Sequence, residues 1–473
     1  MKIRFLERSK EIDMLNGPLL GKVFLFALPL VITNMLQVLY NAADMIVAGM
    51  SNVKGAIGSI GTTTAMINLI LNVFMGFSVG TNVVVARNIG KNDPEATGAA
   101  VHSSLIVGLI TGVFCGILGQ AVCRPVLRLL GDQGHILDLA TLYTRIYFAG
   151  VPFIALSNYL IAIFRAKGDT ATPLVILAGT GLLNVLMNLF FVLVCGMSVD
   201  GVALATVLAN VASTLLLGLT LMRDKGVCRL DLKKLRLDRE AVREIIRDGL
   251  PAGVQGALFS LSNMLIQSTV IGINNRVCPG GSDVIDGNAA AGNLEGFAYV
   301  ATNSVYQASV SFTSQNYGAA KYKRIREVMR SCYFVTGMIA IAVAGILLIF
   351  HKPLLSLYSL GSLSEETAML RMKIMLTPYF TLAFMEVGSG VLRGLGRSTT
   401  STAISLIGSC VFRVIWIMTV VKLVDELWIV YLSYPISWSL TAITHFVFSE
   451  TIRSRYQKRQ EAELRAEAAE ASA

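Results

Sequence analysis

Twelve long apolar stretches divide the 473-residue chain, and they restrict its fold more than any other feature. A helix that crosses the hydrocarbon core of a bilayer needs about 20 apolar residues, and each stretch meets or nearly meets that length. Charged residues make up only 15% of the chain, too few to cover the surface of a soluble protein of this size. The sequence therefore predicts an all-α polytopic membrane protein with twelve transmembrane helices. Their expected bounds are 23–49, 55–86, 96–123, 146–164, 170–199, 201–222, 249–275, 287–320, 331–350, 374–392, 398–421 and 427–449.

The net charge of +10 raises the question of nucleic-acid binding, and the positions of the basic residues answer it. Thirty of the 40 Lys and Arg residues lie in the N-terminus, the even-numbered loops and the C-terminus. This asymmetry follows the positive-inside rule, which places both termini in the cytoplasm. The basic residues therefore indicate orientation in a bilayer, and we expect no nucleic-acid partner.

The two halves of the chain resemble each other across a basic segment near its middle. Pro29 matches Pro251 at a shift of 222, and Arg165–Thr170 matches Arg393–Ser398 at a shift of 228. Because each half contains six spans, both halves start on the same side, which predicts two parallel repeats. The expected domains are an N-terminal lobe over 1–222, a basic linker over 223–248, a C-terminal lobe over 249–450 and a cytoplasmic tail over 451–473.

Only four residues inside the twelve stretches carry a full charge: Asp44, Glu295, Glu386 and Arg413. A charge at bilayer depth costs about 2.5–3.5 kcal/mol on the scale measured by helix insertion. Each of these residues therefore needs a partner, a water-filled cavity or a function. We take the four positions as the main guide to function.

Asp44 ends a row of polar residues in the first stretch. Asn34, Gln37, Asn41 and Asp44 are separated by three, four and three residues, so they lie on one face of a helix. Such a row can join neighbouring helices or can line a cavity. We favour the cavity, because a row of amides that ends in a carboxylate is more hydrated than helix contact requires.

Two amides one turn apart, Asn184 and Asn188, lie in the fifth stretch, and Thr206 lies in the sixth. Amide oxygens, a hydroxyl group and a neighbouring carboxylate suit a hard cation or a proton. These three residues are candidates for a cation-coupling site with Asp44, Asn41 and Gln37 if the three helices meet, which spacing alone does not decide. The one metal ion that these ligands suggest is Na⁺, at Asp44, Asn184, Asn188 and Thr206, and no resident cofactor is expected.

The second half holds the other three charges. Arg413 either pairs with Glu386 or Glu295 as a structural ion pair, or leaves the acids free to attract a cation. Tyr299 and Tyr306 share a helix face with Glu295. The predicted substrate cavity consists of Glu295, Glu386, Arg413, Gln267, Tyr299 and Tyr306.

Motifs for an enzyme or an ATPase are absent from the sequence. The chain contains no Gly-x-x-x-x-Gly-Lys-Ser/Thr loop, and its four histidines have no metal-ligand spacing. We therefore expect a protein that is not an enzyme and whose energy source is a gradient, or none.

Several motifs together resemble the multidrug and toxic compound extrusion (MATE) antiporters. They are Pro29 and Asp44 in the first span, Arg165–Thr170 after the fourth, Ser314–Ala319 after the eighth and Leu392–Gly396 after the tenth. The resemblance covers residues 17–449. It implies two six-helix lobes and export of cationic or amphipathic small molecules in exchange for H⁺ or Na⁺. It also implies a monomer in the cytoplasmic (inner) membrane of a prokaryote.

The same resemblance implies a cation site in the first lobe. Asp44, Asn184 and Thr206 match the family's positions, whereas residue 188 is Asn where the family's pattern has Asp. One formal charge is therefore missing, and Asp44 alone would carry a proton.

A flippase for a lipid-linked oligosaccharide or peptidoglycan precursor is the alternative function. Its substrate carries pyrophosphate, so its cavity should gather Lys and Arg. The predicted spans contain three acids and one arginine, which favours a cationic substrate.

Overall fold

The computed structural model describes residues 11–51, 53, 56–129, 134–358, 360–424 and 426–472, without the side chains of 57, 62, 65, 69, 73 and 468–472. The outer ends of the predicted domains, residues 1–10 and 473, lie outside this range. The described chain forms two compact units. The first unit comprises Leu28–Ala257 and the chain up to Asp13, and the second comprises Met14–Ala27 and Leu258–Ala473.

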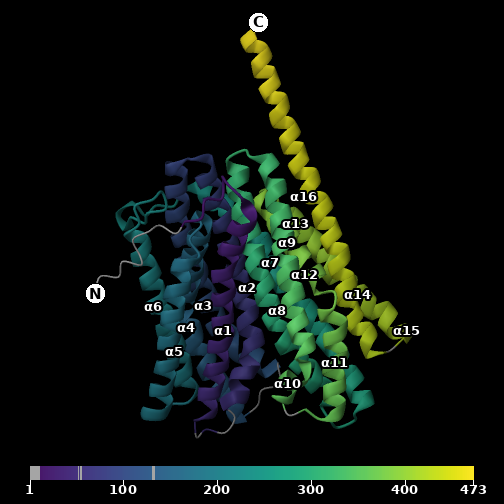
Figure 1. Ribbon diagram of the computed structural model, residues 1–473. Helices are drawn as coiled ribbons and strands as arrows, with labels where there is room; N and C mark the ends of the chain where they lie inside the picture. Colours follow the sequence, from purple (N-terminus) through teal and green to yellow (C-terminus); the bar gives the residue numbers. More distant parts are fainter. Residues whose placement is uncertain are drawn as a thin grey trace. The chain divides into compact units, whose positions relative to one another are not determined.

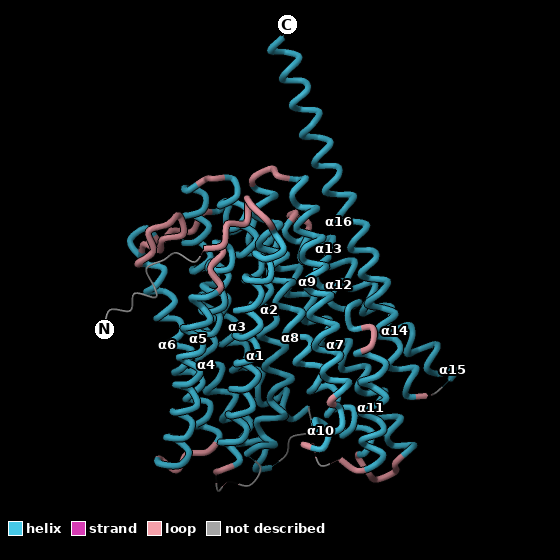
Figure 2. Tube along the Cα trace, in the orientation of Figure 1, coloured by secondary structure: helices cyan, strands magenta, loops and turns pink. Residues whose placement is uncertain are grey.

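Helices make up almost all of both units, and no β-strand occurs in the described ranges (Figures 1 and 2). Two helices contribute to both units, because the unit boundaries fall inside α1, one residue before Pro29, and inside α7. The helices up to α7 are α1 (Leu19–Gly49), α2 (Ala56–Lys91), α3 (Pro94–Leu129), α4 (Gly134–Lys167), α5 (Ala171–Leu189) with a π-helical end (Phe190–Val194), α6 (Val199–Met222) and α7 (Arg239–Val277).

The remaining helices belong to the second unit. They are α8 (Asp283–Gly318), α9 (Tyr322–Ile349), α10 (His351–Ser356), α11 (Ser362–Leu376), α12 (Tyr379–Gly394), α13 (Ser398–Ser405), α14 (Phe412–Trp416), α15 (Lys422–Val424) and α16 (Leu427–Ser472). Two π-helical turns, Leu406–Val411 and Ile417–Val421, join α13, α14 and α15 into one continuous helix. The predicted lobes, which end at residue 222 and begin at residue 249, stay a prediction. The bounds of the compact units do not locate the ends of a sequence repeat.

All twelve predicted spans correspond to helices, and several of these helices extend beyond the predicted bounds. The helix of the fourth span starts at Gly134, before residue 146, and the tenth predicted span falls on α11 and α12, which meet at an angle of 49° near Pro378. By length and composition, nine described helices can cross a membrane, or ten if α11 and α12 count as one span. The other two predicted spans lie in α8 and α16, which are more polar because Ser, Thr and Tyr residues, with Asn and Gln in α8, interrupt their apolar residues.

Glycines allow the start of α7 to lie directly against α2 within the first unit. A Cβ atom on Gly76 would overlap the backbone nitrogen of Gly253, and one on Gly80 would overlap the carbonyl oxygen of Ile245. Close backbone contact of this kind drives helix association where lipid removes the hydrophobic gain. A buried ion pair between Arg87 and Asp248, with atoms 2.9 Å apart, also joins the two helices.

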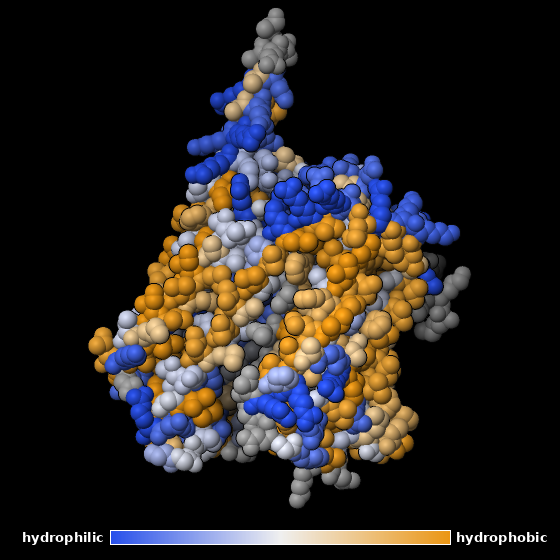
Figure 3. Space-filling view, turned by 180° about the vertical axis from the view of Figure 1, so that it is seen from behind, coloured by the Kyte–Doolittle hydropathy of each residue, from blue (hydrophilic) through white to orange (hydrophobic). Residues whose placement is uncertain are grey.

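Apolar side chains cover much of the helical surface. Figure 3 shows hydrophobic residues over the middle of the helices and hydrophilic residues toward the helix ends. On α3, Ile110, Phe114 and Ile117 lie on one exposed face. The opposite face carries Gly112, where a Cβ atom would lie 2.8 Å from Pro152 of α4. The small residues therefore face the neighbouring helix and the large ones face outward, as expected in a bilayer.

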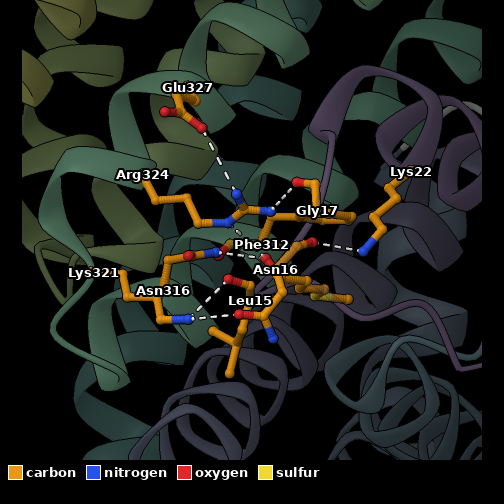
Figure 4. A network of polar contacts seen from close by, with 10 residues as sticks. Leu15, Asn16, Gly17, Lys22, Phe312, Asn316, Lys321, Arg324 and Glu327 are labelled. Atoms are coloured by element: carbon orange, nitrogen blue, oxygen red, sulfur yellow. Dashed lines mark hydrogen bonds and ion pairs between the residues drawn. The ribbon is translucent and has the colours of Figure 1, made fainter.

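The segment before α1 is held by polar side chains of the second unit (Figure 4). Asn316 donates to the carbonyl oxygen of Met14 at 3.0 Å, Lys321 donates to that of Leu15 at 3.0 Å, and Arg324 donates to that of Gly17 at 2.7 Å. Met14 is buried, and a buried backbone carbonyl outside a helix needs such a donor. Asn316 belongs to the motif Ser314–Ala319, so part of this motif serves to hold the chain before α1.

Candidate functional site

A pocket of about 300 Å³ lies among α1, α2, α4, α5 and α6 in the first unit. Its walls include five of the six residues predicted to couple a cation, namely Gln37, Asn41, Asp44, Asn184 and Thr206. The sixth, Asn188, is fully buried and binds Asp44 directly. The structure thus brings together residues from three helices that the sequence could relate only by resemblance.

Three donors surround the carboxylate of Asp44, which is 7% exposed. The Asn188 amide nitrogen donates to Oδ1 of Asp44, and the Thr206 hydroxyl donates to Oδ2 at 3.3 Å. In the orientation that satisfies both of its amide atoms, Asn184 also donates to Oδ1, at 2.9 Å. Because all three groups are hydrogen-bond donors, the site favours the ionised carboxylate of Asp44.

One oxygen in this cluster has no partner. Oδ1 of Asn188 is buried and accepts no hydrogen bond among the described residues. A buried acceptor without a donor costs about 1–3 kcal/mol, so this oxygen marks a position where a proton or a cation would gain a ligand.

Tyrosines complete the pocket, and the sequence had not singled them out for it. Tyr143 and Tyr147 of α4 line the pocket and stack on each other with ring centroids 6.2 Å apart. Tyr143 lies before the predicted start of the fourth span, which explains why it was missed. Tyr40 lies one helical turn before Asp44, and this spacing was the signal that could have revealed it.

Gly181 lets α1 and α5 approach each other at the pocket. A Cβ atom there would overlap the ring of Tyr40, whose hydroxyl donates to the carbonyl oxygen of Ala178 at 3.1 Å. The glycine therefore positions the helix that carries Asn184 and Asn188 close to the helix that carries Asp44.

In the second unit, Glu295 forms a bidentate ion pair with Arg371 of α11. The guanidinium nitrogens lie 2.9 and 2.7 Å from the two carboxylate oxygens. Arg371 also donates to Oδ1 of Asn288 at 2.7 Å, and the Asn288 amide donates to Gln267 at 2.9 Å. The open alternative that paired Glu295 with Arg413 was therefore wrong, and Arg371 was missed because it lies before the predicted start of the tenth span.

Arg413 is enclosed by side chains of α16 and has no acidic partner among the described residues. Its Nε donates to Ser437 at 2.9 Å, and its guanidinium lies 4.2 Å from the ring centre of Tyr434 and 5.8 Å from that of Trp438. Cation–π contact of this kind stabilises a buried guanidinium. The alternative pairing of Arg413 with Glu386 was thus also wrong.

Glu386 is a half-buried acid of α12 that forms no hydrogen bond or ion pair within the described part of the chain. Tyr299 of α8 and Arg393, two turns further along α12, lie within its electrostatic reach. Arg393 donates to the hydroxyl of Tyr306 and lies 5.6 Å from its ring centre. Of the predicted substrate residues, Glu386 is the acid that remains free to meet a cation.

Comparison with known proteins gives a consistent result. The model of the MatE family matches residues 29–190 and 251–419. A probable multidrug resistance protein of Bacillus subtilis, YoeA, is 24% identical over 391 residues, which cover 81% of this chain and 82% of YoeA. The multidrug export protein MepA of Staphylococcus aureus is 22% identical over 93% of this chain and 95% of its own length.

Solved structures confirm the predicted fold class. An outward-facing multidrug resistance MATE family transporter of the MOP superfamily aligns with a TM-score of 0.87 and 22% identity, over 96% of this chain and all of that one. A MOP superfamily transporter from Pyrococcus furiosus aligns with a TM-score of 0.88 and 22% identity, over 95% and 99% of the two chains. The binding pocket of that second protein is described as having a reversed polarity that suggests a different function, so the shared fold does not decide the substrate.

Proposed function

Because this chain belongs to the MatE family of multi-pass membrane transporters, which are not enzymes, we propose that it exports cationic or amphipathic small molecules in exchange for protons. We place the protein in the cytoplasmic membrane of a prokaryote as a monomer, with both termini in the cytoplasm. The orientation rests on the basic residues of the even-numbered loops and the two ends.

The observation that carries this proposal is the buried carboxylate of Asp44 in a pocket without basic residues. Neither Lys nor Arg is among the residues that line this pocket of the first unit. An acid in such a place can bind a proton or a cation and release it when the pocket opens to the other side of the membrane. The absence of basic residues from this lining also argues against a pyrophosphate-bearing lipid, the substrate class of the alternative function.

We favour H⁺ over Na⁺ because of the groups that face Asp44. Na⁺ is a hard cation that needs several oxygen ligands, and a second carboxylate would supply one along with a balancing charge. Here Asn188 occupies that position, and it presents its N–H rather than its oxygen to Asp44. A proton needs only the carboxylate itself, so the site is complete for H⁺ and incomplete for Na⁺.

Protonation of Asp44 would change the contacts between three helices. The ionised carboxylate holds donors of α5 and α6 against α1. A protonated carboxyl group accepts these bonds more weakly and gains one O–H donor. After the Asn188 amide turns, its unpartnered oxygen can accept a hydrogen bond from the protonated carboxyl group of Asp44. A different hydrogen bond then joins α1 and α5. We propose that this exchange of hydrogen bonds couples the binding of H⁺ to the movement of the lobes.

In the second unit we assign attraction of the cationic substrate to Glu386 rather than to Glu295. Glu295 is neutralised by Arg371, whereas Glu386 has no bonded partner among the described residues. Tyr299, which is 44% exposed, provides an aromatic surface near this acid. Aromatic rings bind cations over their faces, so the two side chains suit a flat, positively charged compound.

Purified protein in liposomes tests the proposed function. A pH gradient imposed without Na⁺ should drive accumulation of a fluorescent lipophilic cation such as ethidium, while a Na⁺ gradient at equal pH should not. Accumulation that needs Na⁺ would contradict the proposed ion. Transbilayer movement of a fluorescent pyrophosphate lipid, with no movement of the cation, would support the flippase instead.

The variant Asn188→Asp should change which ion drives transport. A second carboxylate beside Asp44 supplies the missing charge and oxygen for Na⁺. In the same liposomes, we expect a Na⁺ gradient to drive accumulation by this variant but not by the wild type. Asn158→Asp is the matched control, because Asn158 lines the same pocket but forms no hydrogen bond with Asp44. An unchanged ion requirement in Asn188→Asp would show that the residue at 188 does not select the ion.

A further inference from the structure

A second pocket, separate from both polar clusters described above, is lined by residues of α13 and α16 and by Arg397 before α13, all in the second unit. It has a volume of about 390 Å³. Its lining includes Arg397, Thr400, Val447, Phe448, Thr451 and Arg455. The proposed exchange of H⁺ and substrate uses none of them.

One face of α16 changes from apolar to basic where it reaches this pocket. Leu440, Ile443, Val447, Thr451 and Arg455 are spaced by three or four residues, so they lie along one side of the helix. Ile443 is 63% exposed and Val447 is 53% exposed, as expected for side chains that face lipid tails. The face then passes to a hydroxyl group and an arginine, the order found where a helix leaves the hydrocarbon region.

The neighbouring helix shows the same order at the same end. Ile407, which is 66% exposed, shares a helix face with Thr400 and Arg397. Along this face the apolar residue is followed by the hydroxyl group and then by the arginine toward the N-terminal end of α13. Because α13 starts at the pocket and α16 runs toward its C-terminus there, the two helices are antiparallel at this point. A hydroxyl group and an arginine from each helix therefore line the same pocket, above two apolar faces.

The two arginines keep hydrogen-bond donors that no described residue uses. Arg455 forms no hydrogen bond or ion pair in the described chain, and Arg397 uses only its Nε, which lies 3.2 Å from the hydroxyl of Tyr456. No acidic residue is among those that line the pocket, and nearby Glu450 is bound to Arg453 and Arg326. The pocket thus has a positive charge that is not compensated within the described part of the protein.

The start of α13 adds further donors. Arg397 is the residue before the first turn, and no side chain caps this end. The first backbone N–H groups of a helix have no acceptor within it, and they favour an anion, above all a phosphate group. A planar guanidinium likewise binds phosphate oxygens through paired hydrogen bonds.

We propose that this pocket binds an anionic phospholipid of the surrounding membrane. The phosphate group lies between Arg397 and Arg455, beside the hydroxyl group of Thr400, and an acyl chain lies along Val447 and Phe448. The apolar faces below the arginines distinguish this ligand from a free phosphate ion, which would gain nothing from them. Basic pockets between membrane helices bind lipid headgroups by this combination.

Native mass spectrometry of the full-length protein in detergent tests the site, with phosphatidylglycerol and phosphatidylcholine as probes. Each arginine near an anionic lipid contributes about 1 kcal/mol, so Arg397→Gln/Arg455→Gln should bind phosphatidylglycerol roughly thirtyfold more weakly. The matched control is Lys458→Gln/Arg465→Gln, which removes the same charge from the exposed helix beyond the pocket and should bind like the wild type. Arg455→Gln alone disturbs no bond of the described chain and should show a roughly fivefold loss.

Three results would overturn this proposal. The first is equal phosphatidylglycerol binding by the wild type and the double variant. The second is equal binding of phosphatidylcholine and phosphatidylglycerol by the wild type, which would show an apolar groove without headgroup recognition. The third is displacement of the lipid by inorganic phosphate alone, which would identify a free anion as the ligand.

Discussion

Replacement of Asp44 by asparagine abolishes ion-driven export while the protein keeps its abundance and its thermal unfolding midpoint. Asparagine has nearly the same shape as aspartate, and its one amide oxygen can still accept the hydrogen bond from Asn188. Its NH2 group can donate to the Thr206 hydroxyl, which has the carbonyl oxygen of Val202 as an alternative acceptor at 3.0 Å, so the cluster remains packed. It cannot take up or release a proton, so the proposed coupling step is lost. Cellular efflux of ethidium, measured with the membrane abundance of the protein, reports both effects.

The control for this variant is Asp138→Asn. Asp138 is an exposed acid of α4 that pairs with Arg124 at 3.1 Å on the surface of the same unit. An exposed ion pair of this kind contributes little to folding stability, so we expect the Asp138→Asn variant to show wild-type efflux. Wild-type efflux by Asp44→Asn would instead remove Asp44 from the coupling mechanism.

The second large effect concerns the ion pair of the other unit. Arg371→Met leaves the carboxylate of Glu295 buried without its partner, which typically costs about 3–5 kcal/mol of folding free energy. It also removes a donor from Asn288. We expect a lower unfolding midpoint in detergent and low membrane abundance.

The double variant Glu295→Leu/Arg371→Met separates a structural pair from a functional one. Apolar residues of similar size often replace a buried ion pair with little loss of folding free energy. The double variant should therefore regain most of the stability that Arg371→Met loses, and it should retain export. A stable double variant that fails to export would show that Glu295 acts in transport. An unfolding midpoint equal to that of the wild type in Arg371→Met would show that the pair contributes nothing to the fold.

Local periodicity predicted the parts of this protein that depend on one helix at a time. The spacing of Gln37, Asn41 and Asp44 determines that they share a face, and the structure places them on one pocket wall. Spacing carries no information about which helices meet. The approach of Asn184, Asn188 and Thr206 to Asp44 was therefore available from the sequence only through resemblance to a family.

Partners of buried charges were the least predictable feature. Glu295 and Arg371 are 76 residues apart, and Arg371 lies in α11, which the apolar pattern excluded from the tenth span because that helix carries charges. Arg413 was expected to need an acid, but two aromatic rings and a serine surround it. A buried charge can be stabilised by several kinds of neighbour, and only the packing of the helices decides among them.

Proton movement driven by substrate alone tests the proposed coupling most directly. Liposomes with a trapped pH indicator receive the wild-type protein, and a gradient of the fluorescent cation is imposed with equal pH and no Na⁺ on the two sides. We expect protons to enter as the cation leaves, so the lumen acidifies when the cation flows outward, and we expect Asp44→Asn to show neither flux. Cation movement without any pH change, or the same pH change in Asp44→Asn, would contradict exchange of protons at Asp44.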